Sequence, residues 1–242
     1  MGTSTNYKAP TSPPWSGFKN IVTRVARNGS PDSESAQNIV RKYIAVNGGA
    51  RNFSSTGGSI GVQRAGQAVA RNLGGFVRSV SSIGLRNTLE QMGLDFEGRP
   101  VSEVITRLLD YLGGPASSID EVDARNALSD LRDELFRDVQ SLEDMERILD
   151  ERSDGEMLDG LLTNFFGLYL YHQFYRVFYD RLINRVGQVQ AESFLEGIKD
   201  YIQSTLRNRT VTRNIGTIDW NGEEGQQLAQ NIFLETLTVF GG

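Results

Sequence analysis

The chain has 242 residues, of which 38% are apolar and 23% are charged. This length predicts one large domain or two small ones, and the composition is typical of a soluble globular protein rather than a disordered or fibrous one. The absence of cysteine excludes disulfide bonds, thiolate metal sites and cysteine nucleophiles. The single histidine, His172, excludes any site that needs two or three imidazoles. We therefore predict no catalytic residue, no metal site and no cofactor.

The formal net charge of −5 conceals a strong segregation of charge along the chain. Residues 1–89 carry 11 basic and 2 acidic groups, a net charge of +9, whereas residues 90–160 carry 7 basic and 20 acidic groups, a net charge of −13. Residues 161–242 are nearly neutral, with 7 basic and 8 acidic groups. Two interpretations are open: the basic segment forms a surface for nucleic acid or an acidic partner, or the basic and acidic segments face each other within one fold.

The first 16 residues are small, polar and proline-rich and show no helical or alternating period, which predicts a flexible N-terminal arm. Trp15 is the exception, because so large an aromatic side chain at the end of an arm is typical of an anchor in a surface groove. Apolar residues at helical spacing predict short helices over 18–27 and about 34–46. The glycine-rich stretch 48–61 predicts a mobile loop without the pattern of a phosphate-binding loop.

A helix is predicted over 62–83, which Gly74-Gly75 could interrupt. Arg64, Arg71 and Arg78 recur every seven residues and therefore lie along one side of this helix. This basic surface could contact phosphates or an acidic partner. We favour a solvated face or pairing with the acidic segment, because no recognised nucleic-acid motif and no set of stacking aromatic residues accompanies the arginines.

The acidic middle of the chain predicts helices over 100–113, over 118–135 and from 141 onwards. The second of these opens with Ser118 and Glu121 at the spacing of a capping box, in which each side chain bonds the other residue's backbone N–H. Acidic residues crowd the first turns of these helices, where the helix dipole favours them. Because none stands alone among apolar residues, we interpret them as a water-facing side rather than as metal ligands or a catalytic pair.

The longest helix is predicted over 156–186 and contains the aromatic-rich run 165–179. Its opposite faces are both apolar, which is typical of a central helix in a bundle or of a helix partly covered by a partner. Its uncharged stretch is interrupted by polar residues and is too short for a membrane span. His172 lies within this run and is interpreted as a hydrogen-bonded core histidine.

Two further helices are predicted over about 189–207 and 222–239, separated by a polar stretch around Thr210 that could form a short strand or an extended loop. The fold class is therefore all-α: a multi-helix bundle of eight or nine helices, with a flexible arm over 1–16 and a single helical domain over 17–242.

This domain divides into a basic first third over 17–89, an acidic middle over 90–160, and the aromatic core helix with the C-terminal helices over 161–242. The first 30 residues contain no apolar stretch of the length found in export signals, which predicts a cytoplasmic protein.

The chain opens with Met1-Gly2-Thr3-Ser4 and reaches the proline-rich end Pro13-Pro14-Trp15. A Gly57-Gly58 pair, the stretch Ala70-Arg71-Asn72-Leu73-Gly74-Gly75-Phe76 and a Gly113-Gly114 helix stop follow. Together these motifs resemble the QatB proteins of the Qat anti-phage defence systems, most clearly over residues 1–115. The resemblance implies a non-enzymatic subunit encoded beside an ATPase, a QueC-like enzyme and a TatD-like nuclease.

QueC enzymes activate the carboxylate of 7-carboxy-7-deazaguanine with ATP and join it to an amine. The resemblance therefore implies that the QueC-like partner conjugates a 7-deazaguanine to the α-amino group of Gly2, exposed after removal of Met1. Glycine leaves this amine unhindered, and an α-amino group with a reference pKa of about 7.7–8.0 is partly neutral near physiological pH. Thr3 and Ser4 are small and can hydrogen-bond in an extended conformation. Myristoylation of Gly2 would require Ser or Thr where this chain has Asn6.

The alternative function is an unmodified adaptor that binds nucleic acid or the partner ATPase through the basic first third, with Arg64, Arg71 and Arg78 as its centre. An enzyme is a third option, but no nucleophile–base pair, metal cluster or cofactor loop in the sequence supports it.

Overall fold

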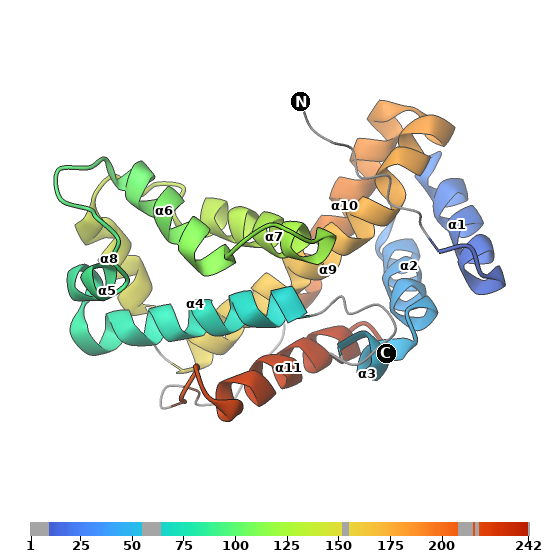
Figure 1. Ribbon diagram of the computed structural model, residues 1–242. Helices are drawn as coiled ribbons and strands as arrows, with labels where there is room; N and C mark the ends of the chain where they lie inside the picture. Colours follow the sequence, from blue (N-terminus) through green and yellow to red (C-terminus); the bar gives the residue numbers. More distant parts are fainter. Residues whose placement is uncertain (1–9, 55–63, 152–154, 208–214, 216–217, 242) are drawn as a thin grey trace.

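The computed structural model describes residues 10–54, 64–151, 155–207, 215 and 218–241, and every regular element in these residues is an α-helix (Figure 1). The all-α fold class is confirmed, but the described residues form eleven helices rather than eight or nine. They are α1 (Pro13–Ala26), α2 (Ser33–Val46), α3 (Gly49–Ser54), α4 (Arg64–Ile83), α5 (Leu85–Gln91), α6 (Val101–Gly113), α7 (Ile119–Leu135), α8 (Leu142–Glu151), α9 (Gly155–Val186), α10 (Gln188–Arg207) and α11 (Glu223–Thr238). The two helices not predicted are short: α3, inside the stretch 48–61 predicted as a loop, and α5.

The first helix begins earlier than the sequence pattern predicts. Its first residue is Pro13, because a proline in the first turn loses no helical hydrogen bond and its fixed φ suits the helix. The Trp15 side chain is 6% exposed and meets the rings of Phe18 and Tyr43 edge-on, with ring centroids 6.1 and 6.0 Å away. Helix therefore replaces the end of the arm predicted over 1–16, and Trp15 is anchored in the core rather than in a surface groove.

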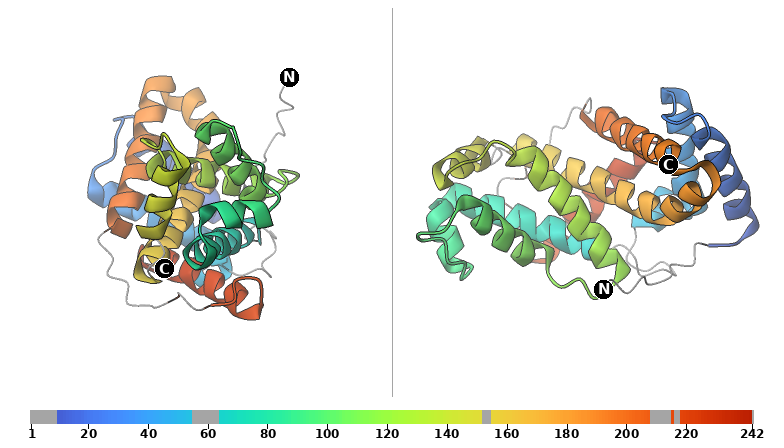
Figure 2. Two further views of the ribbon diagram at one scale, coloured as in Figure 1. Left: turned by 90° about the vertical axis from the view of Figure 1, so that its left-hand side faces the viewer. Right: turned by 90° about the horizontal axis from the view of Figure 1, so that it is seen from above.

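The long helix α9 is the centre of the fold. Seen from above in Figure 2, it runs from the group of α4 to α8 to the group of α1, α2 and α10. Helices α7 and α10 cover it along much of its length, and α1, α4 and α11 also contact it. Every residue from Phe165 to Tyr171 is buried, which is about two full turns, so the helix is covered on all sides there.

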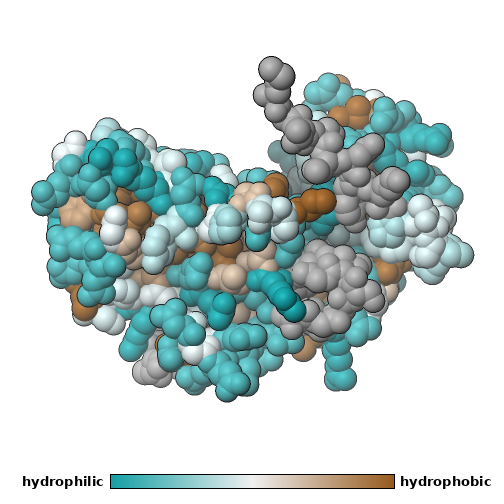
Figure 3. Space-filling view, in the orientation of Figure 1, coloured by the Kyte–Doolittle hydropathy of each residue, from teal (hydrophilic) through white to brown (hydrophobic). Residues whose placement is uncertain are grey.

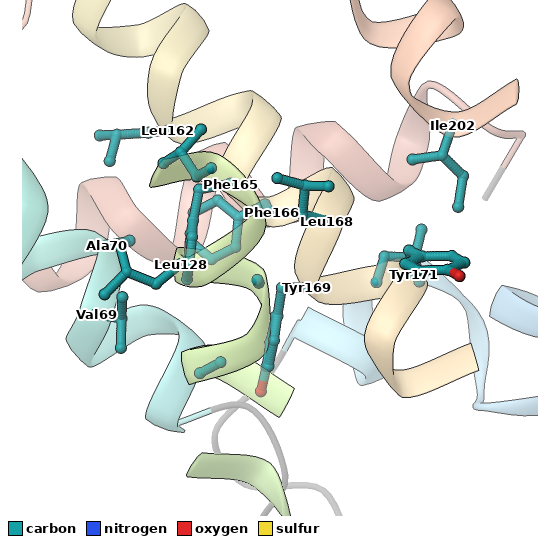
Figure 4. Close-up of a cluster of buried hydrophobic side chains, with 14 of the residues drawn as sticks. Val69, Ala70, Leu128, Leu162, Phe165, Phe166, Leu168, Tyr169, Tyr171 and Ile202 are labelled. Atoms are coloured by element: carbon teal, nitrogen blue, oxygen red, sulfur yellow. The ribbon is translucent and has the colours of Figure 1, made fainter. Parts of the chain in front are cut away.

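Aromatic and aliphatic side chains fill the space around the middle of α9. Figure 4 shows Phe165 and Tyr169 of α9 beside Val69 of α4 and Leu128 of α7. The aromatic core extends from Phe166, which stacks on Phe233 of α11 at a centroid distance of 4.8 Å. The central position predicted for this helix is confirmed by its burial. No helix in the described part of the chain is both long and apolar enough to cross a membrane.

Gly74 and Gly75 do not interrupt α4, which runs unbroken from its first residue to its last. A Cβ at Gly74 would lie 2.6 Å from atoms of the buried Trp220 ring, which is closer than atoms can approach. Gly66 leaves room for the Tyr169 ring in the same way. These two glycines therefore allow large rings to lie directly against the helix backbone, which explains them without a break in the helix.

The two neighbouring glycines of α4 give a matched test of this packing. Substitution of Gly74→Ala should lower the free energy of unfolding by about 1–3 kcal/mol, because the new methyl group collides with Trp220. Substitution of Gly75→Ala should raise it by about 0.5–1 kcal/mol, because a Cβ there meets only the Trp220 Cβ at an ordinary 3.5 Å and alanine favours the helix. Urea unfolding of both variants checks the prediction, and a change of the same sign in both would contradict it.

Candidate functional site

The structure describes only one of the four residues predicted for modification and partner binding. Gly2, Thr3 and Ser4 lie outside the described residues. Trp15 is described, and its indole ring is used by the core of this chain, between Phe18 and Tyr43. In this structure Trp15 therefore helps to hold α1 in place, and its predicted role in partner binding stays a prediction.

The predicted basic surface lies on α4. Arg64 is exposed, and Arg71 and Arg78 are half-buried on the same side of the helix. No described carboxylate lies within 4.0 Å of any of these three guanidinium groups. The seven-residue spacing thus forms the continuous stripe that the sequence predicts, and its charges are not neutralised by ion pairs.

Charge pairing across the described residues follows the segments of the sequence. Of the ten ion pairs, only Arg86–Glu143, at 2.7 Å, joins residues 1–89 to residues 90–160. Six join acidic and basic side chains within 90–160, and the remaining three join this segment to 161–242. Of the two interpretations favoured for the arginine stripe, pairing with the acidic segment is therefore wrong for the described residues, and a solvated face agrees with the absence of ion pairs.

A row of carboxylates on α7 faces α9, and its most buried member is Asp123. The Nε of Arg176 donates to Asp123 Oδ2 at 2.7 Å, and the two side chains are only 17% and 4% exposed. Burial raises the pKa of Asp123 above its usual value, and the charge of Arg176 offsets part of this effect. The pair is thus a buried ion pair, whose loss on one side would leave an uncompensated charge in the core.

Asp120, one turn before Asp123, joins three helices. Its carboxylate accepts hydrogen bonds from the Tyr169 hydroxyl of α9 and from the backbone N–H of Ala65, at 3.0 Å, in the first turn of α4. Burial raises the pKa of Asp120 from 3.8 to about 6, although both hydrogen bonds act in the opposite direction. Tyr169 is fully buried, and its own pKa is raised by burial and by the nearby carboxylate.

Asp130 forms the third contact of the row. It lies 2.9 Å from His172 Nε2 and 2.7 Å from the Lys199 ammonium group of α10. Burial raises the pKa of Asp130, but the hydrogen bonds from His172 and Lys199 lower it by more, so the group stays below its usual value and ionised. An ionised carboxylate only accepts, so Nε2 of His172 carries the hydrogen. The hydrogen bond predicted for His172 is confirmed, but its side chain is 15% exposed and lies at the edge of the core.

The sequence interpretation missed this row, because it assigned the acids of α7 to a water-facing side. Asp120, Asp123 and Asp130 follow helical spacing on the same side of α7 as the buried Ala127, and that spacing is the signal that could have identified them. The capping box is confirmed, with Glu121 N–H donating to Ser118 Oγ at 3.2 Å. Among the described residues, no group of three or more acidic or histidine side chains is arranged to hold a metal ion.

The buried ion pair can be tested by removing one partner and then both. Substitution of Arg176→Met should lower the free energy of unfolding by about 3–5 kcal/mol near neutral pH, because Asp123 is left buried and unpaired. The double variant Asp123→Leu with Arg176→Met should recover most of this loss, because it removes the stranded charge as well. Chemical unfolding of the three proteins checks this, and a double variant less stable than the single one would contradict the account.

Asp120 predicts a pH dependence of stability with a defined sign. Its pKa is raised in the folded state, so the folded protein binds this proton more tightly than the unfolded chain does, and its contribution to stability grows as the pH falls through about 6. The stability difference between wild type and Asp120→Asn should therefore shift in favour of wild type as the pH is lowered from about 7.5 to 5.

Glu121 provides the control for this experiment. Its pKa is lowered, chiefly by the hydrogen bond from the Ser117 side chain, so it titrates below its usual 4.5. The stability difference between wild type and Glu121→Gln should therefore stay constant between about pH 5 and 7.5. Parallel slopes for the two variants in urea unfolding would overturn the assignment of the raised pKa to Asp120.

Comparison with known proteins identifies the family of the chain. A family model described as Qat anti-phage system associated protein QatB matches residues 48–240, which include every helix from α3 to α11. Residues 1–47, with the motif from Met1 to Trp15, lie outside the matched range. Searches of curated proteins and of solved structures give no match. The match spans most of the chain and most of its core, and the chain therefore belongs to the QatB family of anti-phage system proteins.

Proposed function

We propose that this chain is a non-enzymatic, cytoplasmic subunit of its defence system that binds a QueC-like enzyme and presents the α-amino group of Gly2 for conjugation to a 7-deazaguanine. Membership of the QatB family makes the chain a component of an anti-phage system. The observation that carries the finer proposal is the Met1-Gly2-Thr3-Ser4 start of a chain in this family.

The way the chain enters α1 supports this role. Trp15 is buried in the core, and the Lys19 ammonium group donates to the Pro10 carbonyl at 2.6 Å, so the start of the described chain is held against the domain. Gly2 precedes Pro10 by eight residues. Because each residue spans at most about 3.3–3.6 Å, the Gly2 amine can reach at most about 25–30 Å from Pro10. This reach is enough for the amine to enter the active site of an enzyme that docks against the domain.

The chemistry of the terminus supports the same role. Amide formation requires a neutral amine, and an α-amino group is neutral in a far larger fraction near pH 7 than a lysine side chain, whose reference pKa is about 10.4. Glycine has no Cβ, so it fits a narrow active site, and Thr3 and Ser4 add little bulk behind it. We propose the ATPase and the TatD-like nuclease of the system as further partners of the complex.

The experiment is intact-mass measurement with N-terminal fragmentation of the protein expressed alone and together with the QueC-like enzyme. An added mass on Gly2 should be found only after co-expression. It should be lost in Gly2→Val, because a β-branched side chain crowds the amine, and retained in the matched control Ala9→Val. An unmodified Gly2 beside a QueC-like enzyme shown to be active would overturn the proposal.

A further inference from the structure

The outward side of α4 is a helix face without acidic residues. The helix contains no Asp or Glu, and its outward positions carry Arg64, Arg71 and Arg78 with small residues between them. The positions between the arginines on this side are Ala68 and Gly75, which are half-buried, and Gly75 lies against the Trp220 side chain; Ser82, after Arg78, is exposed. A rise of about 1.5 Å per residue places the outer two arginines about 21 Å apart along the helix. The face is therefore a straight row of cationic side chains.

No described carboxylate of the neighbouring helices lies within 4.0 Å of this row, although Asp120 of α7 accepts a hydrogen bond from the backbone N–H of Ala65, next to Arg64. The acids of α6, which contacts α4, are already paired: Glu103 with Arg99 and Arg107, and Asp110 with Arg125. The one ion pair between the basic first third and the acidic middle, Arg86–Glu143, lies beyond the end of α4. The positive potential of the α4 face is therefore available to a ligand in spite of the net negative charge of the chain.

The composition of this face selects one class of partner. Protein interfaces depend on large apolar anchors in their centre, but the only exposed large apolar residue of α4 is Ile83, its last residue. Phe76, the one aromatic residue of the helix, is 4% exposed and cannot stack on a base, as binding of a single strand would require. Figure 3 views the side on which α4 lies, and hydrophilic residues there are interspersed with hydrophobic patches.

We propose that the outward face of α4 binds the phosphate backbone of double-stranded DNA without reading its sequence. Guanidinium groups only donate hydrogen bonds, which suits phosphate oxygens, and α4 carries no acidic side chain that could accept a hydrogen bond from the 2′-hydroxyls of an RNA duplex. Ala68, between Arg64 and Arg71, has too small a side chain to keep a DNA backbone away from this part of the helix. A DNA duplex carries one phosphate per about 1.7 Å of its axis, so each arginine finds a partner along the row.

The experiment measures binding of a fluorescent DNA duplex of about 30 base pairs by anisotropy, between about 25 and 200 mM NaCl. The triple variant Arg64→Gln, Arg71→Gln, Arg78→Gln should bind at least about tenfold more weakly at low salt, and the slope of log K against log salt should fall by about 2–3, because each lost phosphate contact removes about 0.9. Glutamine has nearly the helix propensity of arginine, so α4 should stay folded.

The matched control is the triple variant Arg24→Gln, Arg137→Gln, Arg185→Gln, which removes the same charge from three exposed arginines elsewhere. It should keep nearly the wild-type affinity and salt slope. Absence of duplex binding at low salt, equal weakening in both triple variants, or tighter binding to a single strand or an RNA duplex would overturn the proposal. The α4 variant should still acquire any mass on Gly2, so failure of this proposal and failure of the conjugation proposal are distinguishable.

Discussion

The fold depends on one constraint: α9 is apolar around its whole circumference in its middle turns and must be covered from every direction. A surface helix buries one stripe and needs neighbours on one side only. Here α4, α7, α10 and α11 all contact α9, and Phe166 and Tyr169 project among side chains from different neighbours. The glycines at 66 and 74 of α4 belong to this constraint, because they let aromatic rings lie against the helix backbone. The remaining helices are arranged around this central column.

The polar row between α7 and α9 contributes something that apolar packing cannot. Burying a carboxylate costs free energy, whereas burying a hydrophobic side chain of similar volume does not. The ion pair of Asp123 with Arg176 therefore contributes little net stability compared with such a hydrophobic pair. It does restrict how α7 can slide along α9, since a shift of one turn would separate Asp123 from Arg176 and Asp130 from His172 together. Asp120 extends the restriction to the start of α4. The row therefore adds a polar constraint on the register of three helices to the constraint that the packing of aromatic rings on α4 already provides.

Most of the helices could be predicted from the sequence, because helical spacing of apolar residues is a repeated signal over ten or more positions. Short elements lack that repetition, which is why α3 and α5 were not predicted. The apolar pattern places the start of α1 too late, because Pro13-Pro14 is as typical of an extended arm as of a first helical turn. The buried acids are harder to predict for another reason: the helix dipole stabilises an acid in a first turn, such as Asp120, whether it faces water or a neighbouring helix, and tertiary contacts are needed to show that Asp123 and Asp130 face α9. The seven-residue spacing correctly predicts that the three arginines share one side of α4. Their lack of ion pairs could not be predicted, because it depends on where carboxylates distant in the sequence lie.

The ion pairs that these carboxylates form show why the acidic segment 90–160 rarely pairs with the basic segment 1–89. The acidic segment carries its own arginines at helical spacing, as in Arg99–Glu103 and Arg107–Glu103, and local pairs of this kind form with little cost in chain entropy. Its buried acids are satisfied by Arg176 and Lys199 from the C-terminal third. Other acids of the segment, such as Glu90, Glu97 and Asp138, form no ion pair among the described residues, and none of them lies within 4.0 Å of the α4 arginines. The α4 arginines therefore lack ion-pair partners because of where the acids lie and not because acids are few, and the proposed binding of a polyanion depends on this placement of charge rather than on net charge.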